Sequence, residues 1–148
     1  MDNKYLITVV GEQEVDGNKE KIEIITTGDY MEKDKHKYIS YKEYLDDNPE
    51  HITDTLIDIS PTDYIKITRT NDYKTCLLLQ KGTHHQCHYT TPMGEIMMGI
   101  YTKDITDKLT KHGGDLILDY RINFYSNVVS NNKFHINIKE NNYVENKQ

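Results

Sequence analysis

The segment that decides the fold class is residues 116–124, LILDYRINF, in which the apolar side chains recur at every second position. One face of the segment carries Leu116, Leu118, Tyr120, Ile122 and Phe124. The opposite face carries the polar residues Asp119, Arg121 and Asn123. A period of two residues with one apolar face is typical of a half-buried β-strand. The segment therefore predicts a strand rather than a helix.

The next segment, residues 133–139 with the sequence KFHINIK, alternates in the same way. Residues 130–132, Ser-Asn-Asn, lie between the two segments and have the composition of a turn, which predicts a β-hairpin that reverses there. Eight further segments also read as strands, most of them separated by short runs of turn-forming residues. They are residues 5–12, 21–30, 36–45, 53–59, 64–70, 75–81, 85–91 and 92–105.

The strand connections are too short for parallel crossovers, so the chain reads as a long antiparallel meander. Closing such a meander into a barrel removes its two edges. We therefore expect an all-β fold with one domain, residues 1–148: an antiparallel up-and-down β-barrel of about eight to ten strands. A two-sheet sandwich is the alternative. A helix is indicated only at residues 106–112, where Gly113 and Gly114 would end it.

Composition supports an all-β fold independently of the pattern. The chain has no Ala and no Trp, but it has 17 Ile, 15 Thr and 12 Tyr. Ala is the best helix former, whereas β-branched and aromatic residues favour strands. This composition excludes a helical bundle and argues against an α/β nucleotide-binding fold.

Charge and cysteine content restrict the partners and the compartment. The net charge of −6 repels a phosphate backbone, so we expect no nucleic-acid partner. No apolar run approaches the roughly 20 residues that span a bilayer, and the N-terminus lacks a signal-peptide pattern, so we expect a cytoplasmic protein without a membrane partner. Cys76 and Cys87 are too few for a disulfide framework and are expected to be free thiols.

Several short motifs, taken in their order along the chain, resemble those of a known protein family. They are residues 26–30 (TTGDY), 38–43 (YISYKE), 65–69 (IKITR), 77–82 (LLLQKG), 89–94 (YTTPMG) and 99–105 (GIYTKDI). Over about residues 4–140, the chain resembles the YwiB-like family of small bacterial proteins, a domain of unknown function. The resemblance implies a calycin-type (lipocalin-like) barrel. It implies no reaction, because the family has no settled activity.

Arg69 is one of only two arginines and shares a strand face with Ile65 and Ile67, which should point inward. Glu43 shares a face with Ile39 and Tyr41, so neighbouring strands could bring the two charges together inside the barrel. A charge facing a barrel interior must be paired or hydrated. Two interpretations remain open: an ion pair that closes one end of the barrel, or an arginine that offers its planar fork to a ligand carboxylate or phosphate.

Three inward tyrosines, Tyr41, Tyr89 and Tyr120, could line a ligand cavity or simply fill volume. The faces of residues 36–45 are ambiguous, because Tyr38 and Tyr44 compete with Ile39 and Tyr41 for burial. The histidine-rich stretch at residues 84–88 invites a metal interpretation. In a strand its ligands would point to both faces, however, so at most two could converge, and zinc needs at least three. We expect no metal and no cofactor.

No motif indicates nucleophilic catalysis or a phosphate-binding loop. Three functions remain. The first is a non-enzymatic barrel that binds a small amphipathic or anionic ligand through Glu43, Arg69 and the three tyrosines. The alternative is a protein–protein interaction or structural module, possibly a homodimer, since tyrosine is enriched at interfaces. A remote alternative is an enzyme that uses the interior Glu43.

Overall fold

The computed structural model describes residues 5–44, 52–124 and 127–141, except for the side chains of residues 89, 91 and 127–129. Ten strands account for almost all of these residues. They are β1 (Tyr5–Val15), β2 (Asn18–Lys33), β3 (His36–Tyr44), β4 (Ile52–Ile59), β5 (Tyr64–Thr70), β6 (Lys74–Gln80), β7 (His84–Thr91), β8 (Gly94–Thr110), β9 (Gly113–Phe124) and β10 (Asn127–Glu140). Within the described residues there is no helix long and apolar enough to cross a membrane.

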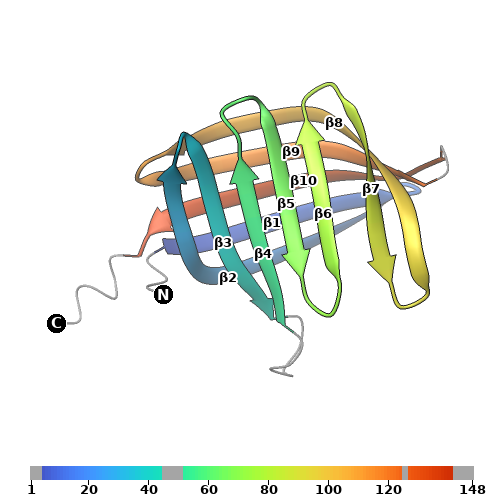
Figure 1. Cartoon of the computed structure of the whole chain (residues 1–148), viewed down its shortest axis with the longest axis horizontal. Coiled ribbons are helices and arrows are strands. Elements are labelled where there is room, and N and C mark those ends of the chain that lie inside the picture. Colours follow the sequence, from blue (N-terminus) through green and yellow to red (C-terminus); the bar gives the residue numbers. More distant parts are fainter. Residues whose placement is uncertain (1–4, 45–51, 125–126, 142–148) are drawn as a thin grey trace.

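All ten strands belong to one antiparallel sheet with the order β6-β5-β4-β3-β2-β1-β10-β9-β8-β7. Neighbours in the sheet are neighbours in the sequence, and the additional pairing of β1 with β10 joins the two ends of the chain. In Figure 1, β3 to β6 run across β1, β10, β9 and β8, which lie behind them, so the sheet curls around on itself. The predicted up-and-down barrel is confirmed. It is nearly closed, with β6 and β7 as the two strands at the open seam.

Alternation along the strands places the apolar side chains inside the barrel. Leu116, Leu118, Ile136 and Ile138 are all at most 1% exposed, as the patterns of β9 and β10 predict. In β3, Ile39, Tyr41 and Glu43 are buried, so the inward face that the sequence left ambiguous is the one that carries Glu43. Cys87 is buried and Cys76 partly buried, and both are free thiols, as expected.

The predicted helix at residues 106–112 is wrong, because β8 continues to Thr110 and pairs with β9. The two glycines do not end a helix but begin β9, with φ of +116° at Gly113 and +134° at Gly114. A Cβ at Gly114 would lie 2.3 Å from the carbonyl oxygen of Lys108. The glycines are therefore needed for a tight reversal and a close strand approach, which the local sequence does not distinguish from a helix stop.

The predicted turn at residues 130–132 is also wrong. β10 passes through this stretch, where Ser130 pairs with Ile122 of β9 and is 2% exposed. The strand contains a register shift between Val128 and Ser130. Asn131 also pairs with Glu14 of β1, so neighbours on both sides hold the segment extended. Pairing with two strands overrides the local turn preference of Ser and Asn.

Candidate functional site

Arg69 and Glu43 form an ion pair inside one end of the barrel. Arg69 Nη2 donates a hydrogen bond to Glu43 Oε2 over 2.5 Å. The Glu43 side chain is only 3% exposed, whereas that of Arg69 is 46% exposed. The ion pair is one of the two interpretations that the sequence left open. The expectation of neighbouring strands is wrong, because the two residues lie on β3 and β5 with β4 between them. Arg69 thus holds a buried carboxylate on one side and reaches solvent on the other.

The short side chains of β4 leave room for this contact across an intervening strand. Thr55 pairs with Tyr41 on one side and with Arg69 on the other, and Thr53 pairs with Glu43. Both threonines are buried, at 2% and 4% exposure. A larger inward side chain at either position would lie between the guanidinium and the carboxylate.

The structure brings two of the three predicted tyrosines to the same place. Burial raises the pKa of Tyr41 well above its usual value, and Glu43 raises it further, while Arg69 and Thr55 act in the opposite direction. Burial also raises the pKa of Tyr120, again with Arg69 opposing. Both phenols are therefore protonated at neutral pH and can donate a hydrogen bond. The side chain of the third, Tyr89, lies outside the described residues.

Three buried hydroxyls lack a hydrogen-bond partner of acceptable geometry among the described residues: Tyr41 Oη and Thr55 Oγ1 beside Arg69, and Thr102 Oγ1 beside Tyr120. Thr102 is fully buried and pairs with Tyr120 across β8 and β9. Buried polar groups are nearly always hydrogen-bonded, so unsatisfied groups call for a partner such as water or a ligand. We name these six residues the polar layer: Tyr41, Glu43, Thr55, Arg69, Thr102 and Tyr120.

Sequence reasoning missed Thr55 and Thr102, although a signal was present. Thr55 occupies an inward position two residues before Ile57, and Thr102 lies two residues after Ile100. A hydroxyl on an otherwise apolar strand face is the pattern that could have identified them. Threonine is also a common strand residue, however, and this weakens the signal.

The histidines of residues 84–88 each contact a different partner. His84 Nε2 lies 3.0 Å from Asn123 Nδ2, and His85 Nε2 lies 3.3 Å from Gln80 Oε1. His88 lies 3.6 Å from Glu95 on the neighbouring strand. Across the described ranges, no group of three His, Cys, Asp or Glu side chains is arranged to hold a metal ion.

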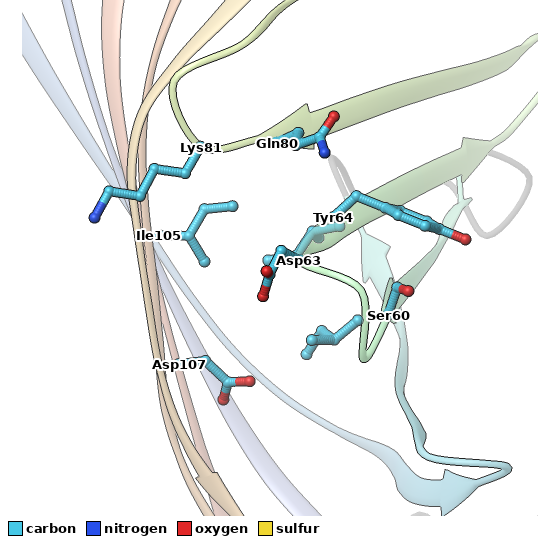
Figure 2. Close-up of a pocket in the computed structure, with 9 residues that line it drawn as sticks. Ser60, Asp63, Tyr64, Gln80, Lys81, Ile105 and Asp107 are labelled. Carbon is cyan, nitrogen blue, oxygen red and sulfur yellow. The ribbon is translucent and has the colours of Figure 1, made fainter.

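A pocket of about 490 Å³ lies at the opposite end of β4 and β5 from Arg69 (Figure 2). It is bounded by the β4–β5 turn, the end of β6 and the C-terminal part of β8. The following residues line it: Ile59, Ser60, Asp63, Tyr64, Ile65, Gln80, Lys81, Ile105 and Asp107. Ile65 and Arg69 are four residues apart on one strand, or roughly 13 Å at about 3.3 Å per residue. The pocket and the Arg69–Glu43 ion pair are thus two separate features.

The fold and the polar layer together define the class of protein: a nearly closed antiparallel up-and-down barrel with a buried ion pair and hydroxyls at one end, consistent with a calycin-like barrel. The chain belongs to the family described as "Domain of unknown function (DUF1934)", whose model matches residues 7–136. The predicted family relationship is thereby confirmed. A comparison with curated proteins found no match.

Among solved structures, the chain is similar to the ywiB protein from Bacillus subtilis, known from a crystal structure. The TM-score is 0.80 at 24% sequence identity, over 92% of this chain and 90% of the other. At this identity the likeness establishes a shared fold.

Proposed function

We propose that the protein is a non-enzymatic barrel that binds a small amphipathic ligand with an anionic group at the polar layer. The observation that carries this proposal is that three buried hydroxyls are poorly satisfied: Tyr41 Oη and Thr55 Oγ1, beside the half-exposed Arg69, have only each other, outside good hydrogen-bond geometry, and Thr102 Oγ1, beside Tyr120, has no partner among the described residues. Leaving such groups unsatisfied costs about 1–3 kcal/mol each, so a ligand that accepts their hydrogen bonds regains that free energy.

The hydrogen-bond donors of the polar layer suit a ligand with a carboxylate group. A guanidinium has five N–H groups in a rigid fork, and Glu43 accepts from only one nitrogen of Arg69. The Arg69 side chain is 46% exposed, so a ligand can reach it from solvent. The raised pKa values of Tyr41 and Tyr120 keep both phenols protonated as additional donors. An entering carboxylate would therefore share Arg69 with Glu43 and accept from a phenol.

Native mass spectrometry of the full chain as purified tests this proposal. We expect a retained small molecule that is lost on denaturation. In parallel, isothermal titration calorimetry with octanoate, an amphipathic carboxylate, measures binding by the protein after refolding. Arg69→Lys keeps the positive charge but removes the fork, and we expect it to weaken octanoate binding about tenfold. Tyr41→Phe removes a phenol donor without changing the ring and should weaken binding severalfold.

The matched control is Arg121→Lys. Arg121 is the other arginine of the chain and lies 4.9 Å from the centre of the Tyr101 ring. It is not part of the polar layer, so this variant should bind octanoate as the unmodified protein does. The proposal would be contradicted if native mass spectrometry showed only the mass of the chain itself and calorimetry showed no heat of octanoate binding. Equal weakening by the Arg69 and Arg121 variants would also contradict it, because binding would then depend on surface charge.

A further inference from the structure

We propose that the pocket at the β4–β5 end is a second binding site, which takes a protonated amine carrying an apolar chain. The site is separate from the Arg69–Glu43 ion pair of the polar layer and does not depend on it. Between the two lie Ile57 and Ile67, at 0% and 4% exposure, in a filled part of the core. The ligand class follows from the volume of the pocket, its apolar floor and its charged groups.

The volume and the floor suit an apolar body. Small-molecule sites usually have about 300–1,000 Å³, and this pocket has about 490 Å³. Ile59 and Ile65 form part of its wall and are 6% and 2% exposed. Ile105 of β8 packs against the same core and faces the pocket (Figure 2). An alkyl chain placed here would contact three isoleucines and lose its hydration.

The charged groups favour a cation. Figure 2 shows the carboxylates of Asp63 and Asp107 directed toward the space between β8 and the β4–β5 turn, while the Lys81 side chain points away from it. Lys81 pairs with Asp104 over 3.1 Å. Asp107 is neutralised in part by Lys37 at 3.1 Å. Within the described part of the chain no cationic group pairs with Asp63, so the pocket carries a net negative charge.

These two features select an ammonium group over other polar heads. Carboxylates only accept hydrogen bonds, and an ammonium group has three N–H donors. An anionic head would be repelled, and a hydroxyl head would make only uncharged donor contacts. The net charge of −6 also draws cations toward the protein at low salt. Octylamine therefore fits this pocket, whereas octanoate, with the same chain length, does not.

An NMR titration of the ¹⁵N-labelled full chain with octylamine tests the site. We expect saturable shifts of the backbone amides of Asp63 and Ile105, with smaller shifts at Thr55 and Arg69 in the polar layer. Asp63→Asn removes the charge and keeps the shape. It also suits the backbone, because Asp63 has φ +70° and asparagine tolerates this region. We expect this variant to weaken octylamine binding about tenfold.

The control variant is Asp54→Asn, which makes the same charge change on an exposed residue of β4 that lies 3.9 Å from Lys42. It should leave octylamine binding unchanged. The site would be overturned by the absence of a saturable shift, by equal binding of octan-1-ol, or by equal weakening by the two variants. Shifts confined to the polar layer would overturn it as well. None of these results depends on whether octanoate binds at Arg69, so the two proposals can fail separately.

Discussion

At the scale of single residues, the two partners of the Arg69–Glu43 ion pair differ in burial, because Glu43 is buried and Arg69 is half-exposed. Breaking a buried pair by removing one partner leaves an uncompensated charge, which costs more than the pair itself contributes. Stability should therefore depend on Arg69 far more than on a surface arginine.

We predict that Arg69→Ala lowers the free energy of unfolding by about 2–3 kcal/mol, at the low end for a buried pair because Arg69 is partly solvated. Urea denaturation followed by circular dichroism measures this change. Removing the buried charge as well, in Arg69→Ala with Glu43→Gln, should recover part of the loss. No recovery in the double variant would show that Arg69 acts through packing rather than through charge.

Tyr30 provides a second prediction at this scale. Burial, followed by Asp107, Glu32 and Tyr5, raises its pKa from 10.0 to about 12. The unfolded state therefore loses the Tyr30 proton first. The stabilisation that comes from the raised pKa of Tyr30 is complete below pH 10 and is lost as the pH rises from about 10 to 12. We expect Tyr30→Phe to lose less stability than the unmodified protein over this pH range.

Denaturation curves at pH 8, 10 and 11.5 measure that difference. At pH 8, Tyr30→Phe should itself be less stable by about 1 kcal/mol, because the phenol donates to the carbonyl oxygen of Thr110 over 2.8 Å. Parallel pH profiles for the two proteins would be incompatible with the raised pKa of Tyr30.

At the scale of elements, the β8–β9 reversal shows that a Gly-Gly dipeptide is compatible with both a helix end and the start of a strand. Gly113 and Gly114 indicate a helix stop when read alone, yet they begin a strand because neighbouring backbones approach closely. Periodicity predicted the type of all ten strands, since each half-buried strand repeats a local period. It failed at residues 106–112 and 130–132, where pairing with distant strands decides the conformation.

We predict that Gly114→Ala lowers the melting temperature strongly, with a free-energy cost of about 2 kcal/mol or more. The added Cβ would lie 2.3 Å from the carbonyl oxygen of Lys108, in a residue with φ +134°. The control is Gly17→Ala, in a turn with φ +81° and no atom within 4 Å of the added Cβ. It should cost only the backbone strain, about 1 kcal/mol. Equal effects of the two substitutions would contradict the close-approach argument.

At the scale of the whole molecule, the seam between β6 and β7 is the weak point of the barrel. The two strands are the ends of the sheet order and share no ladder. Side chains bridge the seam instead, as His85 does to Gln80 over 3.3 Å. Burial raises the pKa of the Cys87 thiol, and the backbone N–H of Leu78 on the facing strand opposes that shift. Side-chain contacts of this kind restrain a strand less than a row of backbone hydrogen bonds does.

We therefore predict that amide hydrogen exchange is fastest, among the strands, in β6 and β7 and slowest in β1, β9 and β10. The last three are joined to one another by the long β1–β10 and β10–β9 ladders and are also paired on their outer sides, with β2 and β8. Hydrogen exchange followed by mass spectrometry of peptic fragments measures this order, because exchange reports local opening. Uniform protection of all ten strands would show that the barrel opens only globally. It would contradict a seam that opens first.

The sequence by itself determined the strand type, the antiparallel meander, the inward faces of most strands and the family. All of these depend on local periods and short motifs. It also placed Arg69 and Glu43 on inward faces. Only the tertiary structure decided that the two residues meet across β4, that Thr55 lies between their strands, and that a pocket opens at the other end of β4 and β5. Such convergence depends on the register, twist and closure of the sheet, which arise from pairings such as β1 with β10 between residues far apart in the chain.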